Sequence, residues 1–429
     1  MKRTLAVLVV LLMACTLLFA AGQQEEEVNA DSGKIVLYSP SWGIEFAEEM
    51  IAEYAKVKPG VEIELMRGPS AWNEHVGRTS LWMKTKFSGV DLVYMDDSGI
   101  VDGVPNGYWE KLDDVLAPGS IENLVGLQQK YIDAHGGLYR VPWWNGMGYL
   151  FYRIDMFEEA GIEVPTTWDE LMVAAEKLTI DKDNDGTIDQ WGYLTQGGPG
   201  EMYNNWTEFL MQAGGDQFKY AENGKATDEA LNALLFMKEL YNTVTPPDMV
   251  AIDYNQSRAM FTQGKAAILR DWADTGRLAV TEGMTDKIGV MEFPAGPAGS
   301  WGVGHSWGIA VNKFGDNYKK NPQAIVDFLN FMMTDEIHSI SAKAEGPALA
   351  SIMDDPAKLD KIIQGSIVIE HFSDFINHRD VRNFPAGNSA EYMDIIGKNI
   401  SAFVFDRDAD LADANDVLVT IQEGLDPLF

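Results

Sequence analysis

Tryptophan and carboxylate side chains recur at the ends of segments that the sequence predicts to be strands. Trp42 follows the first such segment. Asp96 and Asp97 come directly after an apolar run, and Asp271 and Trp272 follow a later strand. In open α/β sheets, ligands bind outside the carboxyl ends of the strands, so these side chains are expected to meet. An indole ring packs on the apolar face of a pyranose, and carboxylates bond to its hydroxyls.

The pattern therefore indicates a site for a sugar-like ligand. For the adjacent pair Asp96 and Asp97, helix capping or turn formation is the alternative role. The chain has 12 tryptophans, and eight stand beside Gly, Pro, Asn or Asp at loop-like positions. A single loop tryptophan is as often packed in a core, but eight at segment ends favour a site. They are Trp42, Trp72, Trp143, Trp144, Trp206, Trp272, Trp301 and Trp307.

The elements that position these residues alternate between strand and helix. The segments IVLYS, VEIEL and VDLVYM have the apolar or alternating pattern of strands, and a helix is predicted over 46–56. This order predicts βαβ units and an α/β fold. The last hundred residues are predicted to be mostly helical. Further strands are predicted over 149–153, 266–269, 288–291 and 309–313, and further helices over 168–178 and 322–333.

Length and charge exclude several classes of protein. The 429 residues include 33 Lys and Arg against 65 Asp and Glu, which gives a net charge of −32. This charge argues against a nucleic acid or an anionic membrane surface as a partner. A composition with 46% hydrophobic and 23% charged residues is that of a globular protein. The length suggests two or three domains.

The N-terminal segment has the layout of an export signal. Lys2 and Arg3 precede an apolar run over 5–21, which ends in small residues and is followed by QQEEE. We therefore predict a signal peptide over 1–22, a linker over 23–33, and a mature protein in the periplasm or another extracytoplasmic compartment. Alternatively, the residues before Cys15 resemble a lipoprotein box, in which case Cys15 is lipidated and anchors the chain. In the first case the mature chain has no cysteine for a disulfide or a nucleophile.

Two longer segments resemble a known family. Residues 141–179, which begin VPWWNGMGYLFYR and contain P-x-T-W-x-E-L, and residues 258–272, RAMFTQGKAAILRDW, are similar to segments of the maltose-binding-protein-like group. These are extracellular solute-binding proteins of bacterial carbohydrate ABC transporters. The resemblance implies a class II-like periplasmic binding protein fold, in which each lobe is a sheet flanked by helices. A sugar would bind in the cleft, and the lobes would close over it by hinge rotation.

The resemblance also implies boundaries and contacts. Lobe 1 would comprise 34–144 and 303–334, and lobe 2 would comprise 145–302 and 335–429, with crossings near 142–145, 299–304 and 333–335. The protein would act as a monomer, deliver its sugar to the permease subunits of an ABC transporter, and need no cofactor. Whether Trp143 or Trp144 faces the cleft stays open. The implied ligand contacts are Trp42, Asp96, Asp97, Trp143, Asn145, Trp206, Asp271, Trp272, Trp301 and Trp307.

An acidic segment, DKDNDGTIDQWG over 181–192, has the spacing of a calcium loop. Asp181, Asp183 and Asp185 stand at alternate positions, Gly186 permits a sharp turn, and Asp189 is a further ligand. Position twelve is a glycine instead of the usual glutamate, so tight EF-hand binding is not expected. The two interpretations are a structural Ca²⁺ site and a metal-free connector with Asx turns.

Enzyme interpretations are weaker. The segment GHSWG over 304–308 satisfies G-x-S-x-G, but a strand-like segment follows Ser306 where a nucleophile elbow requires a helix. A secreted glycoside hydrolase would share the tryptophans and carboxylates, but the sequence does not reveal a second carboxylate across a scissile bond. The six histidines include no H-x-x-x-H pair, which disfavours zinc. A polyol or another small non-sugar solute is the alternative ligand.

Overall fold

The computed structural model describes residues 33–429 except residues 71, 344, 376–378, 382–383 and 386. The predicted signal peptide, Cys15 and all but the last residue of the predicted linker lie outside the described residues. Within the described part of the chain, no helix combines the length and the apolar character of a membrane span.

The first lobe is built on a six-stranded mixed sheet with the order β12-β11-β3-β1-β2, in which β4 also pairs with β11. β1 is parallel to β2 and β3, whereas β11 is antiparallel to β3 and β4. The continuous apolar run predicted as a central strand is β3, and all of its residues are buried. The strands are β1 (Gly33–Ser39), β2 (Val61–Arg67), β3 (Leu92–Met95), β4 (Arg140–Met147), β11 (Gly302–Val311) and β12 (Arg379–Val381).

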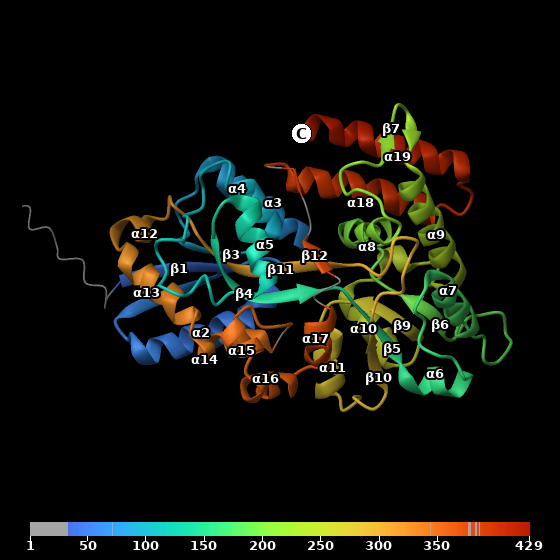
Figure 1. The fold of residues 1–429 in the computed structure, drawn as a ribbon, viewed down its shortest axis with the longest axis horizontal. Helices are drawn as coiled ribbons and strands as arrows, with labels where there is room; N and C mark the ends of the chain where they lie inside the picture. The colour runs from blue at the N-terminus through green and yellow to red at the C-terminus, as the bar shows by residue number, and fades with distance from the viewer. Residues whose placement is uncertain (1–32, 71, 344, 376–378, 382–383, 386) are drawn as a thin grey trace, which may run out of the picture.

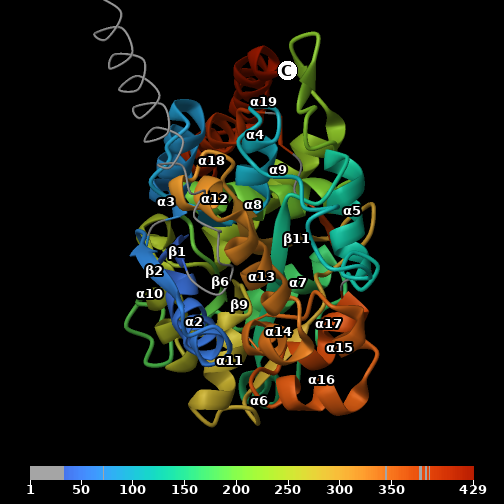
Figure 2. The same cartoon turned by 90° about the vertical axis from the view of Figure 1, so that its left-hand side faces the viewer.

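Helices cover both faces of this sheet. Figures 1 and 2 show α3 and α4 on one side and α2, α13 and α14 on the other. The apolar stripe of α2, which includes Phe46, Met50 and Tyr54, faces the sheet. The helices of this part are α2 (Ile44–Val57), α3 (Trp72–Thr85), α4 (Asp97–Gly103), α5 (Gly126–His135), α12 (Asp316–Lys320), α13 (Pro322–Met332) and α14 (Asp335–Ala342).

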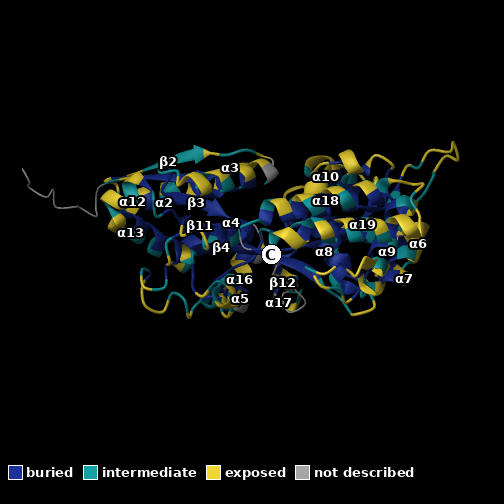
Figure 3. Cartoon of the chain, turned by 90° about the horizontal axis from the view of Figure 1, so that it is seen from above, coloured by how far each residue is buried: buried dark blue, intermediate teal, exposed yellow. Residues whose placement is uncertain are grey.

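The second lobe has a four-stranded sheet with the order β10-β5-β9-β6. Figure 3 shows the strands of both sheets largely buried beneath helices with exposed outer faces. The strands are β5 (Tyr149–Arg153), β6 (Trp191–Leu194), β9 (Ala266–Asp271) and β10 (Ile288–Met291), with a small hairpin of β7 (Ala221–Glu222) and β8 (Lys225–Ala226). The helices are α6 (Ile154–Ala160), α7 (Trp168–Lys177), α8 (Pro199–Gln212), α9 (Asp228–Val244), α10 (Tyr254–Thr262), α11 (Asp274–Thr281), α18 (Ser389–Phe405) and α19 (Leu411–Leu425).

The predicted α/β architecture of two lobes, each a sheet flanked by helices, is confirmed. Two crossings lie elsewhere than expected. β4 stays in the first sheet up to Met147 and reaches β5 through Gly148 alone, because it pairs along its length with β11. Helix α14, which the expected boundaries assign to lobe 2, packs against β4 and α2 of lobe 1. Three short helices, α15 (Ala350–Met353), α16 (Pro356–Ile363) and α17 (Ile369–Phe375), precede β12, which still pairs with β11.

The lobes also touch outside the crossing strands. Asp102 on α4 accepts hydrogen bonds from the backbone N and Oγ of Ser389, at 3.0 and 2.8 Å, where α18 begins. The guanidinium of Arg277 on α11 lies 5.8 Å from the ring centroid of Phe46 on α2. These contacts hold the two lobes together around the strands that connect them.

Candidate functional site

Side chains from both lobes meet on one face of β11. His305 and Trp307 are two residues apart on this strand, so their side chains leave the same face of the sheet. The residues opposite them on β4 are Gly146 and Trp144, which lie on the same face because they are direct cross-strand partners. This face is where the aromatic side chains of both lobes gather.

On the lobe 1 side, four rings form a group that we call the first aromatic cluster: Trp42, His75, Tyr94 and Trp307. Trp42 lies in the 3₁₀ turn Ser41–Gly43 after β1, and its ring centroid is 5.6 Å from that of Trp307 in an edge contact. Tyr94 from β3 stacks on Trp307 at 4.9 Å. His75 from α3 lies 5.8 Å from both indoles. Trp42 is only half-buried, so part of its indole surface is open to a ligand.

His75 and Tyr94 are uncharged members of this cluster. Burial lowers the pKa of His75 to about 4, and the charge of Asp96 opposes this only partly. Burial also raises the pKa of Tyr94 well above its usual range, and the carboxylates of Glu345 and Asp96 add to the shift. At neutral pH both rings are therefore neutral and add no charge to the cluster.

On the lobe 2 side, Trp272 follows β9 and reaches the same face of β11. Its ring contacts that of His305 edge to face at 4.7 Å. Its Nε1 donates to Tyr254 Oη at 3.1 Å, and the Arg270 guanidinium lies 4.2 Å from its ring centroid. Trp272 is half-buried, like Trp42. The structure thus brings the predicted residues Trp42, Trp272 and Trp307 to one place between the lobes.

The adjacent carboxylates Asp96 and Asp97 have different roles. Asp96 is fully buried and caps α4, because its Oδ1 accepts from Ser98 Oγ at 2.5 Å and from the Gly99 backbone N at 3.4 Å. Its charge acts to raise the pKa of His75 in the first aromatic cluster. Asp97 instead forms a buried ion pair with Arg140, whose Nη2 lies 2.8 Å from Asp97 Oδ1. Capping, the alternative role for this pair, is therefore found at Asp96.

Asp271, also predicted as a contact, is occupied by neighbouring protein groups. Arg258 donates hydrogen bonds to this carboxylate from Nε and Nη2, at 2.6 and 3.2 Å. Thr275 Oγ1 donates to it at 2.6 Å, and Gln196 Nε2 lies 3.4 Å away. The carboxylate is fully buried. Its place in the structure is to fix the loop that carries Trp272.

A bulge in β4 explains the adjacent tryptophans. Trp144 pairs with Trp307 and Pro142 pairs with Gly308, so Trp143 is an extra residue in β4. Both indoles consequently contact Tyr94, with ring centroids at 5.3 Å for Trp143 and 5.7 Å for Trp144.

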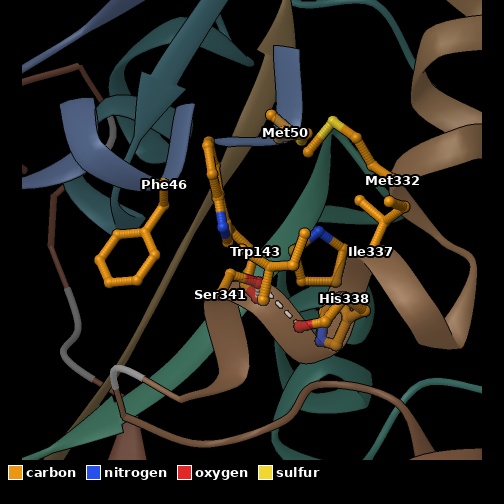
Figure 4. Close-up of a pocket in the computed structure, with 9 residues that line it drawn as sticks. Phe46, Met50, Trp143, Met332, Ile337, His338 and Ser341 are labelled. Atoms are coloured by element: carbon orange, nitrogen blue, oxygen red, sulfur yellow. Dashed lines mark hydrogen bonds between the residues drawn. The ribbon is translucent and has the colours of Figure 1, made fainter. Parts of the chain in front are cut away.

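Trp143 packs under α2, α13 and α14 (Figure 4), beside a cavity of about 10 Å³ lined by Phe46, Met50, Met332 and Ile337. That volume holds at most one water molecule and no sugar ring. Of the two tryptophans, Trp144 is the one that lies on the face of His305 and Trp307.

Three other predicted contacts lie away from Trp42 and Trp272. Asn145 is on the opposite face of β4, where its Oδ1 accepts from Gln128 and its Nδ2 donates to the Pro347 carbonyl at 3.2 Å. Trp206 is fully buried inside lobe 2, with its ring 5.9 Å from Tyr220. Trp301 is half-buried, and its carbonyl accepts from Gln212 at 2.6 Å. Among the described residues, no ring contact joins Trp206 or Trp301 to the first aromatic cluster or to Trp272.

Sequence reasoning did not find His75, Tyr254, Arg270, His305 or Glu345. Glu345 Oε2 lies 3.2 Å from His305 Nε2. A Cβ on Gly146 would stand 1.5 Å from that Oε2, so a larger residue here would displace the Glu345 carboxylate from His305. Of these residues, only His305 could have been predicted from the sequence. If 302–311 is recognised as one strand, His305 lies two residues from Trp307 and therefore on the same face.

The segment GHSWG lies wholly inside β11, with Ser306 buried and accepting from Gln128 Nε2 at 2.6 Å. No helix begins after it in this strand, so the strand, turn and helix of a nucleophile elbow are not formed here.

The acidic loop brings together three of its four predicted ligands. Carboxylate oxygens of Asp181, Asp183 and Asp189 lie within 4.8 Å of one another. Asp185 instead accepts from the Thr187 backbone N at 2.7 Å. Gly186 has a φ of +89°, which makes the predicted sharp turn. Such hard oxygen donors suit Ca²⁺, so the residues present fit that ion.

Comparisons with known proteins agree with this fold. A probable ABC transporter-binding protein from Deinococcus radiodurans is 28% identical over 300 residues, which are 63% of this chain and 68% of that protein. The structure of maltose-bound MalE3 from T. maritima is similar at a TM-score of 0.75 and 22% identity, over 92% of this chain and 100% of the other. An ABC transporter solute-binding protein from Agrobacterium radiobacter in complex with ribitol is similar at a TM-score of 0.72 and 23% identity, over 92% and 98%.

A family of bacterial proteins matches residues 41–338, which are more than half of the chain and include all strands of the second sheet and most of the first. The matching family is that of the bacterial extracellular solute-binding proteins. The resemblance drawn from residues 141–179 and 258–272 is therefore confirmed. The chain belongs to the bacterial extracellular solute-binding proteins.

Proposed function

We propose that this protein captures a neutral sugar, with an oligosaccharide as the first candidate, between its lobes and delivers it unchanged to an ABC permease. The observation that supports this most is the meeting of indoles from both lobes, Trp42 with Trp307 and Trp272, on one face of β11. Indole faces bind the apolar faces of sugar rings, and a ligand that touches both lobes favours the closed form. The related structures with maltose and ribitol make a sugar or a polyol the ligand class to test first.

Around Trp272, the charges favour neutral ligands over phosphorylated ones. The arginines nearest to Trp272 are already paired: Arg270 with Glu208 at 2.8 Å, and Arg258 with Asp271 at 2.6 Å. Arg277 likewise pairs with Asp274 at 3.1 Å. A phosphate would meet these carboxylates without a free guanidinium beside Trp272 to offset the repulsion.

A thermal-shift screen tests the ligand class. Maltose, maltotriose, ribitol, mannitol and glucose 6-phosphate are compared, because a ligand that binds only the folded state raises the melting temperature. At about 100 times its Kd, a ligand adds about 2.7 kcal/mol to the stability. We expect a shift of several degrees with a neutral sugar and none with glucose 6-phosphate. A shift with a polyol alone would replace the sugar by a polyol, and a shift with the phosphate alone would contradict the proposal.

Recovery of the ligand separates a receptor from a hydrolase. We expect a bound oligosaccharide to be returned intact, at one molecule per chain, after long incubation. Release of shortened products over many turnovers would instead identify a secreted glycosidase. Export to the periplasm or another extracytoplasmic compartment and action as a monomer are parts of the same proposal.

We also propose that Asp181, Asp183 and Asp189 hold a structural Ca²⁺. The ion would join carboxylates that otherwise repel one another, so it should stabilise the loop before β6. We expect 1 mM Ca²⁺ to raise the melting temperature by a few degrees and EDTA to reverse this. Asp181→Asn should abolish the response, whereas Asp286→Asn, a change of an exposed residue elsewhere in lobe 2, should retain it. An equal response in both variants would place any calcium elsewhere.

A further inference from the structure

Trp272 is held by a closed circuit of side chains from three elements. Arg270, two residues earlier on β9, places its guanidinium 4.2 Å from the centroid of the indole. The indole Nε1 donates to Tyr254 Oη on α10 at 3.1 Å. The carboxylate of Glu201 on α8 lies near the Tyr254 hydroxyl and contributes, after burial, to the rise in its pKa. Glu201 Oε2 in turn lies 3.8 Å from Arg270 Nη1, which closes the circuit.

Arg270 is itself fixed in position. Glu208 on α8 accepts from its Nε and Nη2, at 3.0 and 2.8 Å. Both residues are almost completely buried, at 1% and 2% exposure, so water does not compete for this pair. Glu208 Oε1 also lies 3.4 Å from the backbone N of Val303 at the start of β11. The cation under Trp272 is therefore connected to the strand that joins the lobes.

Two constraints of this kind are enough to fix an indole. The side chain has two free torsions, and a cation against the ring restricts the plane while a bonded N–H restricts rotation within that plane. Burial raises the pKa of Tyr254 well above its usual range, so its hydroxyl keeps the proton while its oxygen accepts from Trp272 Nε1. A ring that is ordered before the ligand arrives spares the complex the entropy loss of ordering it.

We infer that Arg270 and Tyr254 are positioning residues, which hold the Trp272 indole in the orientation that a ligand requires without touching the ligand themselves. This inference rests on the proposed function, because it assigns Trp272 to the ligand. According to this inference, Arg270 and Tyr254 affect the affinity only by orienting the Trp272 indole.

The first test needs no ligand. In ¹⁵N-labelled protein, the indole N–H signal of Trp272 is identified by its loss in Trp272→Phe. We expect Tyr254→Phe to move this signal and to speed its exchange with water by at least about 10-fold, since the acceptor is gone. The control is Tyr108→Phe, which also removes a partly buried hydroxyl hydrogen bond, to the Phe87 carbonyl at 3.0 Å in lobe 1, and should leave the signal unchanged. An unchanged Trp272 signal in Tyr254→Phe would overturn the inference.

The second test measures affinity for a ligand found in the screen. Loss of one hydrogen bond to the indole should weaken binding about 3- to 10-fold in Tyr254→Phe, and Arg270→Lys should do the same because lysine cannot reproduce the fork to Glu208. In the Trp272→Phe background, Tyr254→Phe should cause no further loss, because its effect acts through the indole. An equal loss in both backgrounds would mean that Tyr254 contacts the ligand and would overturn the inference.

The two tests distinguish a failure of this inference from a failure of the proposed function. If no sugar or polyol binds, the proposed function fails, and the indole signal still decides whether Tyr254 orders the ring. If a ligand binds but affinity is unchanged in Tyr254→Phe and Arg270→Lys, the positioning role alone fails. A control for folding is the melting temperature of each unliganded variant.

Discussion

Replacing Trp272 with alanine is expected to remove most of the affinity for the ligand while leaving the unliganded fold intact. A central aromatic contact is worth about 2–4 kcal/mol in binding, which is a loss of roughly 30-fold or more. The folded state should tolerate the change because the ring is half-buried and stands at the end of β9, outside the core of lobe 2. Isothermal titration with the ligand found in the screen, together with the melting temperature of the free protein, measures both effects.

A matched control for this change is Trp191→Ala. Trp191 is also half-buried in lobe 2 and stands at the opposite end of the same sheet, where β6 begins. It should retain the affinity of the wild type although it loses an indole of the same size. Unchanged binding in Trp272→Ala would remove this residue from the site, and an equal loss in Trp191→Ala would show that any indole lost from lobe 2 has the same effect.

Much of the fold could be predicted because burial leaves a clear pattern in the central strands. In the apolar run that became β3 and the β-branched run that became β1, every buried residue is hydrophobic except Ser39 at the end of β1. β11 was predicted only over its last part. Its first half contains Gly302, Gly304, His305 and Ser306, which have no alternating pattern because helices and strands bury both of its faces. Pairing with β4 and β12, which a single sequence does not reveal, makes this half a strand.

The site was predicted in part for a similar reason. Trp42 and Trp272 follow strands that were recognised, so the rule that ligands bind at the carboxyl ends of strands locates them. Trp143 and Trp206 have the same residue type but are packed inside their lobes, and residue type does not distinguish the two environments. Tyr254 and Arg270 were missed because their roles depend on which side of α10 and β9 faces Trp272, and this is decided by tertiary packing.

Replacing Asp97 with alanine is expected to destabilise the fold and to spare the affinity, which separates this residue from the ligand contacts predicted beside it. Arg140 is 3% exposed, and its guanidinium pairs with Asp97 at 2.8 Å. Removing the carboxylate leaves a buried cation without its ion-pair partner, which typically costs about 3–5 kcal/mol. Urea denaturation should therefore show a large fall in the free energy of unfolding. Titration below the unfolding transition should give a Kd close to that of the wild type.

The physical basis for this separation is that a buried ion pair contributes little net stability when complete but is costly to break. When Asp97 is gone, Arg140 keeps its contact with the ring of Tyr131, at 4.7 Å, and this contact does not neutralise the cation. Asp133→Ala on α5 is the control, since Asp133 is exposed and such changes are usually within about 0.5 kcal/mol. If Asp97→Ala instead unfolds like the wild type and fails to bind, Asp97 is a ligand contact.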